Sequence, residues 1–193
     1  MHESVLFVDV QKGFCPKGSL PVPNGDEVVQ PLNELGKHSR SNNWTLIASR
    51  DWHPADATKH FKTWGAHCVQ GTDGAEFHPD LKMEGVIVFS KGMNPEEDSY
   101  SAFDGINEQG ETLGDFLRRS GITDIHVGGL ATDYCVQASV LSAIAQGFNT
   151  TLLTDAIRAV DVKPGDGIRA IEKMRLSGAK ITTVKELIGA KRN

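Results

Sequence analysis

The alternation of short, continuously apolar runs with longer segments of helical spacing constrains the fold of this chain most strongly. Six of the apolar runs are rich in β-branched residues and lack the polar–apolar alternation of a strand that is exposed on one face. We therefore expect strands that are buried on both faces, as in a parallel sheet. These runs are residues 4–10, 44–49, 85–90, 124–128, 150–155 and 180–184.

The segments between these runs carry apolar residues at helical spacing, and glycines mark where several of them end. Gly121, Gly147 and Gly178 each follow such a segment, in the position where glycine commonly terminates a helix. Strands that alternate with helices predict right-handed βαβ units. We expect one three-layer α/β/α domain over residues 1–193, with a doubly wound, mostly parallel sheet of six strands. The expected helices are residues 26–40, 111–120, 132–146 and 166–177.

Residues 50–84 interrupt this alternation. The stretch contains tryptophan and several histidines but no clear helical or strand periodicity. Long loops inside compact domains are usually either functional or disordered, and aromatic side chains argue against disorder. We expect a functional loop here.

Composition excludes several classes of function. The chain has 193 residues and a formal net charge of −5, which gives no electrostatic reason to expect a nucleic-acid partner. No apolar run approaches the roughly 18 residues that a membrane span needs, and the N-terminus lacks the features of a signal peptide. The three cysteines are widely spaced, so reduced thiols in a cytoplasmic protein are expected rather than disulfides. The longer helices could pair in a homo-oligomer, but the sequence leaves the oligomeric state open.

Reactive side chains follow four consecutive expected strands. Asp9 ends the first, Asp51 and His53 end the second, Lys91 ends the third, and Cys135 lies in the first turn of the helix after the fourth. Ligands of open α/β sheets bind beyond the carboxyl ends of the strands. Each residue alone is weak evidence, but four strands that deliver such groups to one rim predict an active site there.

Cys135 is the candidate nucleophile. A free thiol with a pKa of about 8.5 is mostly protonated at neutral pH. The N-terminus of a helix and a nearby Lys91 would both lower that pKa, and a buried Asp9 could accept the proton and later pass it to a departing amine. The alternative for Cys135 is a small apolar residue that packs the helix against the sheet.

Asp51 and His53 form a second constellation, with His67 in the following loop. Residues i and i+2 of an extended segment point to the same side, so Asp51 and His53 can chelate one ion. A carboxylate and two imidazoles suit zinc, iron or manganese, with positions left for water or substrate. His60 is a further candidate ligand, and its alternative is a polar loop histidine.

At this point the sequence resembles the isochorismatase-like cysteine hydrolases, and within them the nicotinamidases and pyrazinamidases. The motifs that carry the resemblance span nearly the whole chain and occur in the family's order. They are LFVDVQKGFCPKGSLPVPNG (residues 6–25), SRDWHP (49–54), WGAHCVQGTDGAEFHPDL (64–81), FSKG (89–92), SYSAF (99–103) and GGLATDYCV (128–136).

The resemblance implies a catalytic triad of Asp9, Lys91 and Cys135. It also implies a cis peptide bond before Ala131, which would direct the amides of Ala131 and Cys135 at an oxyanion. The implied metal ligands are Asp51, His53 and His67, with His60 matching a fourth ligand of some members. Phe14 and Trp64 match a pair of aromatic rings that sandwiches a flat substrate, and Tyr100, Phe103 and Ala131 match further parts of the substrate pocket.

The activity implied by the resemblance is hydrolysis of nicotinamide to nicotinate and ammonia in NAD salvage, and of pyrazinamide to pyrazinoate. The reaction would pass through a thioester on Cys135 and would use one divalent metal ion, with zinc expected first and iron or manganese as alternatives. The partners expected are small-molecule substrates, with no nucleic acid and no membrane.

Three other functions compete with this expectation. A related cysteine amidohydrolase would act on a carbamoyl or ureido substrate, although such enzymes generally lack the Asp–His–His set. A metal hydrolase would attack with bound hydroxide and use Cys135 only for packing, so it would keep its activity after Cys135→Ala. A binding protein that kept the fold would usually have lost a catalytic residue, and none of the expected ones is missing here.

Overall fold

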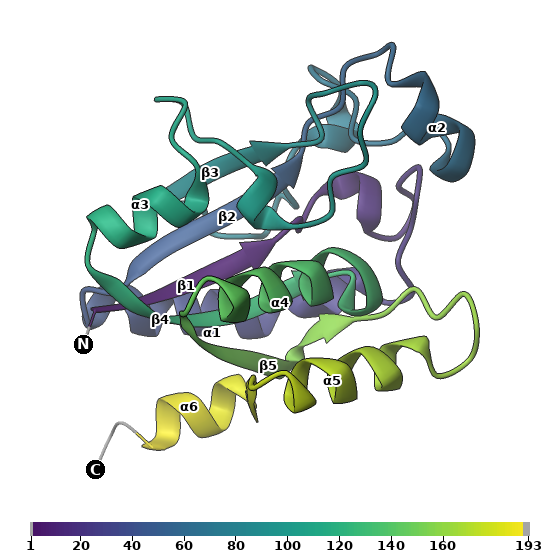
Figure 1. Ribbon diagram of the computed structural model, residues 1–193. Helices are drawn as coiled ribbons and strands as arrows, with labels where there is room; N and C mark the ends of the chain where they lie inside the picture. The colour runs from purple at the N-terminus through teal and green to yellow at the C-terminus, as the bar shows by residue number, and fades with distance from the viewer. Residues whose placement is uncertain (1, 191–193) are drawn as a thin grey trace.

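The computed structural model describes residues 2–190 and is built around one six-stranded sheet (Figure 1). Every pair of neighbouring strands is parallel. The spatial order is β3-β2-β1-β4-β5-β6, so the direction of winding reverses between β1 and β4. The strands are β1 (His2–Val8), β2 (Thr45–Asp51), β3 (Val86–Lys91), β4 (Ile122–Leu130), β5 (Asn149–Arg158) and β6 (Lys180–Thr182).

Helices cover both faces of the sheet, which makes the expected three layers. Helices α1 (Val29–Ser41) and α6 (Val184–Ala190) lie on one face, and α3 (Leu113–Arg119), α4 (Gln137–Ala145) and α5 (Asp166–Leu176) lie on the other. Figure 1 shows α4 in front of the sheet and α1 behind it. Successive side chains of a strand point to opposite faces, so the strands supply two separate apolar cores. In β1, Leu6 and Val8 join the core under α4, whereas Val5 and Phe7 join the core under α1.

The sequence predictions of fold class and strand content are confirmed. All six expected strands are present, and each differs from its expected bounds by only a few residues. The backbone has positive φ at Gly121, Gly147 and Gly178, which act as helix terminators as expected. The predicted single domain of residues 1–193 also includes residue 1 and residues 191–193, which lie outside the described part of the chain.

Two helices were not expected. Helix α2 (Thr58–Trp64) lies within the stretch that has no clear periodicity, and α6 follows β6. The expected helix of residues 132–146 begins with a π-helical turn, Thr132–Val136, before α4. Short 3-10 turns occupy Lys12–Phe14, Gly25–Val28, Asp73–Ala75 and Ala102–Asp104.

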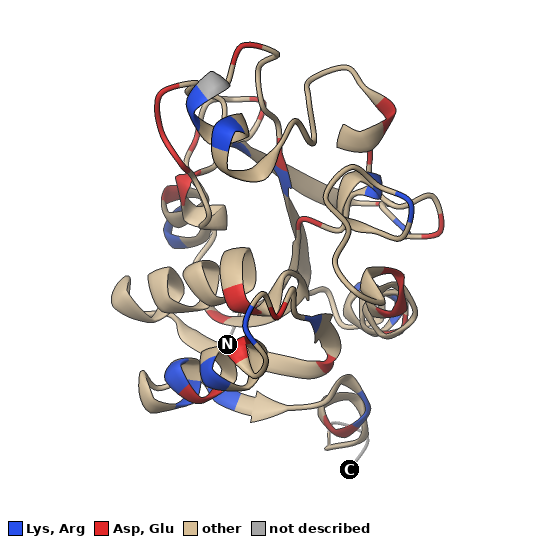
Figure 2. Ribbon diagram, turned by 90° about the vertical axis from the view of Figure 1, so that its right-hand side faces the viewer, with Lys and Arg blue, Asp and Glu red and all other residues tan. Residues whose placement is uncertain are grey.

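Charged residues of both signs are interspersed over the helices and loops (Figure 2). Within residues 2–190, no helix is both long enough and apolar enough to cross a membrane.

Candidate active site

The centre of the site is a buried lysine that contacts two buried carboxylates. Lys91 is the last residue of β3, and its register partner in β2 is Asp51. The Nζ atom of Lys91 donates a hydrogen bond to Asp51 and lies 3.0 Å from Oδ2 of Asp9. Asp9 follows β1 with a left-handed backbone (φ 49°), and the hydroxyl of Ser49 donates to its Oδ1 at 2.6 Å. The sequence placed Asp9 and Lys91 at the same rim, whereas the Asp51–Lys91 contact was not expected.

Burial and the charge of Lys91 shift the pKa values of the two carboxylates in opposite directions. Burial raises the pKa of Asp9 above its usual value, and the charge of Lys91 opposes this only in part. Burial also acts on Asp51, but the charge of Lys91, helped by the two neighbouring histidines, holds its pKa well below the usual value. The carboxylates in turn raise the pKa of Lys91 well above its ordinary value, although burial alone would lower it. Of the two carboxylates, Asp9 is therefore the one that takes up a proton more readily.

Cys135 lies beside this ion cluster, in the π-helical turn that follows β4. Its Sγ is 3.6 Å from Nζ of Lys91, and the side-chain ligand atoms of Asp9, Asp51 and Cys135 all lie within 4.8 Å of one another. The prediction that the pKa of Cys135 is lowered is wrong. Burial raises the pKa of Cys135 well above its usual value, and the positive charge of Lys91 only moderates this, while Asp9 adds to the increase. The thiol thus rests in its neutral form next to a carboxylate that can accept its proton.

The residue between β4 and this turn is Ala131. The peptide bond between Leu130 and Ala131 is cis, as expected. The carbonyl of Ala131 accepts hydrogen bonds from the amides of Tyr134 and Val136, both at 3.1 Å. These bonds tie the start of the turn to the segment that holds the thiol, so Ala131 and Cys135 are fixed relative to one another.

Three histidines form a cluster next to the acid–base centre. One ring nitrogen from each of His53, His60 and His67 lies within 4.8 Å of the other two. In all three rings Nδ1 is already engaged: with the carbonyl of Gly92 at 2.9 Å, with Asp98 at 2.6 Å and with the carbonyl of Gly65 at 2.8 Å, respectively. An Nδ1–H that donates to oxygen leaves the Nε2 lone pair available, which is the arrangement of metal-ligating histidines.

The histidine cluster fits a divalent metal ion. Among residues 2–190, the buried Nε2 of His53 has no hydrogen-bond partner, which is costly unless another group satisfies it. Oδ2 of Asp51 lies 3.5 Å from Nε2 of His53 and 3.8 Å from Nε2 of His67. Three imidazoles and one carboxylate suit zinc, iron or manganese. The structure places the ring of His60 beside those of His53 and His67, and its role as a ligand stays a prediction.

A pocket opens over the thiol and the histidines. Phe14, Trp64, Tyr100 and Ala131 line it, as the resemblance implied. Trp64 donates from Nε1 to the hydroxyl of Tyr100 at 3.0 Å, which fixes two of the aromatic walls against each other. Asp51, His60, His67 and Cys135 line the same pocket, so the aromatic walls, the histidine cluster and the thiol share one cavity.

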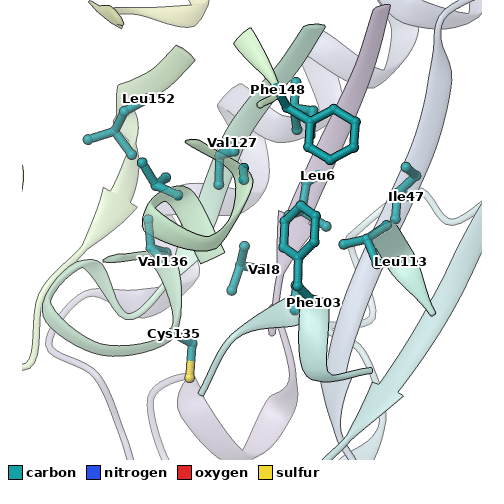
Figure 3. Packing of buried hydrophobic residues seen from close by; sticks show 14 of the residues in the cluster. Leu6, Val8, Ile47, Phe103, Leu113, Val127, Cys135, Val136, Phe148 and Leu152 are labelled. Atoms are coloured by element: carbon teal, nitrogen blue, oxygen red, sulfur yellow. The ribbon is translucent and has the colours of Figure 1, made fainter. Parts of the chain in front are cut away.

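Phe103 is not part of this pocket, contrary to expectation. Its ring lies 5.9 Å from that of Phe148 in the core under α4, and the pocket lining does not include it. Figure 3 shows Phe103 and Phe148 inside this core, with Cys135 at its edge. A buried aromatic in a short turn is compatible with a core position or a pocket wall, and the sequence does not distinguish them.

Two further residues at the site were not singled out from the sequence. Tyr134 lines the pocket and packs edge-to-face on Trp64, with ring centroids 4.9 Å apart. Its position directly before Cys135 was a usable signal. Gln11 is completely buried and contacts the backbone of Asp51. A polar residue two positions after a buried strand-end carboxylate was the corresponding signal.

Comparison with known proteins agrees with this geometry. The sequence profile of the isochorismatase domain matches residues 3–186. A nicotinamidase of Escherichia coli (strain K12) is 39% identical, with 95% of each chain covered. A nicotinamidase/pyrazinamidase of Mycobacterium tuberculosis is 32% identical over 92% of this chain and 97% of the relative. The crystal structure of a pyrazinamidase of Pyrococcus horikoshii in complex with zinc has a TM-score of 0.85 at 38% identity, covering 95% of this chain and 99% of that one. This chain therefore belongs to the isochorismatase domain family.

Proposed function

We propose that this protein hydrolyses nicotinamide to nicotinate and ammonia, and pyrazinamide to pyrazinoate and ammonia, as part of NAD salvage. The observation that carries the proposal is the position of Asp51, which contacts both Lys91 beside the thiol and the histidine cluster. One pocket thus joins a cysteine nucleophile to a metal-binding set. The similarity to nicotinamidases and pyrazinamidases over almost the whole chain supports the same activity.

The pocket favours a flat aromatic amide. The rings of Phe14 and Trp64 would hold the substrate ring, and Tyr100 and Tyr134 would close the wall around it. This placement would direct the carboxamide carbon towards Sγ of Cys135. Holding the two reacting groups in one orientation removes much of the entropic cost of bringing them together.

The first half of the reaction forms a thioester. Asp9 takes the thiol proton of Cys135 as the sulfur attacks the amide carbon, and the positive charge of Lys91 stabilises the thiolate that develops. The amides of Ala131 and Cys135 would donate to the oxyanion of the tetrahedral intermediate. Asp9 then returns its proton to the amide nitrogen, the C–N bond breaks, and ammonia leaves.

The second half releases the acid. Asp9, again ionised, removes a proton from a water molecule as its oxygen attacks the thioester carbon. The C–S bond breaks when this second intermediate collapses, and the proton on Asp9 returns to the sulfur of Cys135. The net change is one water consumed, with the carboxylic acid and ammonia as products.

Asp51, His53, His60 and His67 are the residues that we propose hold a divalent ion. Such an ion, when bound, supplies Lewis acidity that can orient a ring nitrogen and polarise water. Zinc is the first candidate, because these donors suit it and a similar pyrazinamidase structure contains it. We also propose that the protein acts in the cytoplasm, which its three unpaired cysteines favour.

Ammonia release from nicotinamide and from pyrazinamide by purified protein tests the proposal. Wild type and Cys135→Ala are measured before and after chelation, with zinc, iron or manganese restored separately. We expect turnover of both amides by wild type, loss on chelation, recovery with added metal, and no turnover by Cys135→Ala. Activity that survives Cys135→Ala would indicate a metal-bound hydroxide as the nucleophile. No ammonia from either amide with any of the metals would refute the assignment and favour a carbamoyl or ureido substrate.

A further inference from the structure

The carboxamide of Gln11 braces the backbone of Asp51. Gln11 is completely buried, and its Oε1 accepts a hydrogen bond from the amide of Asp51 at 2.8 Å. Its Nε2 donates to the carbonyl of Asp51 at 2.8 Å and to the carbonyl of Ala75 at 2.8 Å. Both backbone groups of Asp51 are therefore bound by one side chain.

The course of β1 explains why Asp51 needs this contact. The ladder between β1 and β2 ends at the pair Val8 and Ser49, because the chain turns at Asp9 with φ 49°. Asp51 lies two residues further along β2 and has lost its neighbour on that side. The Oε1 atom and one N–H of the carboxamide bind Asp51 as the C=O and N–H of an adjacent strand would, and the second N–H binds Ala75. Gln11 thus replaces a missing strand at the last residue of β2.

The same residue also fixes the loop beyond the site. The bond from Gln11 to Ala75, together with the backbone bridge between Gln11 and Phe77, holds residues 73–77 against the end of β1. These three bonds engage both donors and the acceptor oxygen of the carboxamide. Gln11 is not among the residues that line the substrate pocket, so it acts through Asp51.

We propose that Gln11 is a positioning residue, which fixes the main chain of Asp51 so that its carboxylate reaches Lys91 and the histidine cluster at once. The inference rests on the proposed function in one respect, the role of Asp51 as a metal ligand. Partners that orient a metal ligand typically change metal affinity or activity by about 10- to 100-fold when they are removed. We expect a loss of this size in zinc affinity when Gln11 is replaced.

Zinc affinity, measured by competition with a chromophoric chelator, tests this without any substrate. Gln11→Met keeps the length of the side chain and removes all three bonds. Asn33→Leu is the matched control, because Asn33 also braces a loop backbone with one carboxamide, donating to the carbonyl of Asp80 and accepting from the amide of Lys82, both at 2.8 Å. We expect zinc binding to weaken about 10- to 100-fold in Gln11→Met and to stay at the wild-type value in Asn33→Leu.

Folding of each variant is checked by circular dichroism before zinc is added. Should Gln11→Met not fold, Gln11→Glu serves instead, since it keeps the shape and the acceptor but loses both donated bonds. A folded Gln11 variant with wild-type zinc affinity would overturn the proposal, and so would failure of both variants to fold while Asn33→Leu folds, because Gln11 would then be a purely structural brace. Failure of zinc to bind the wild-type protein would overturn both this proposal and the proposed metal site. If wild type binds zinc but does not turn over nicotinamide, the zinc affinities of wild type and the Gln11 variants can still be compared. That outcome would contradict the proposed activity and not the role of Gln11.

Discussion

Replacing Asp9 by asparagine tests the central acid–base assignment with little disturbance of the fold. Asparagine has the same shape as aspartate and is one of the few residues that readily adopts the left-handed backbone found at this position (φ 49°). The hydroxyl of Ser49 can still donate to the side-chain oxygen, as it does to Oδ1 of Asp9. Lys91 keeps Asp51 as its carboxylate partner. The variant therefore removes the proton acceptor and leaves its surroundings in place.

The structure indicates a large loss of turnover. A positioned general base contributes about 10²- to 10⁴-fold. The other carboxylate at the site, Asp51, cannot replace Asp9, because its pKa is held well below the usual value. We therefore expect kcat for nicotinamide to fall by roughly 10³- to 10⁴-fold, which is about 4–5 kcal/mol of transition-state stabilisation at 1.36 kcal/mol per decade. KM should change little, since Asp9 is not among the residues that line the substrate pocket.

A second quantity, the rate at which iodoacetamide alkylates Cys135, should increase in Asp9→Asn. The carboxylate of Asp9 raises the pKa of Cys135 through its charge and its hydrogen bond. Removing that charge lowers the thiol pKa, so more thiolate is present at pH 7 and iodoacetamide should alkylate Cys135 faster than in wild type. Steady-state ammonia release gives kcat, and mass spectrometry of the Cys135 peptide gives the alkylation rate. Ser49→Ala, which leaves the carboxylate intact, is the control and should lose much less activity. Turnover by Asp9→Asn within a few-fold of wild type would refute Asp9 as the base.

Three other substitutions test the core, pocket and metal-binding roles separately. Phe103→Ala should lower the free energy of unfolding by about 3–5 kcal/mol in urea titrations and leave KM unchanged, because the Phe103 ring packs on Phe148 in the core. Trp64→Ala should instead raise KM for nicotinamide roughly 3- to 10-fold, because it removes a pocket wall. His60→Ala should weaken zinc binding in a chelator competition, since its ring nitrogen lies within 4.8 Å of those of His53 and His67; an unchanged zinc affinity would remove His60 from the donor set.

The sheet could be predicted from the sequence because its strands are buried on both faces. Val5, Leu6, Phe7 and Val8 are four consecutive apolar residues, and such a run is a strong signal for a central parallel strand. Helix α2 gave no such signal. Its seven residues carry only Phe61 and Trp64 as large apolar groups, and Trp64 is held by contacts to Tyr100 and Tyr134, which are distant in sequence. Tertiary contacts, rather than local periodicity, account for this helix.

The residues of the site could be predicted better than their interactions. Asp9, Lys91 and Cys135 all follow strands, and parallel strands bring their carboxyl ends to one rim. The bond between Asp51 and Lys91 depends on the register of β2 against β3, which the sequence does not specify to one residue. The direction of the Cys135 pKa was wrong for a related reason. The sequence identified the charges near the thiol, but the extent of its burial, which dominates, depends on the whole fold.

The strand order has a consequence for how the chain matures during synthesis. All the side chains proposed to bind the ion, together with Asp9 and Lys91, precede the nucleophile, and Cys135 follows Lys91 by 44 residues. At about 5–20 residues per second, the ribosome needs roughly 2–9 s to add these 44 residues. Until β4 emerges, one edge of β1, a central strand of the finished sheet, has no partner. The nascent chain therefore exposes an apolar strand edge during this time, a feature that favours aggregation.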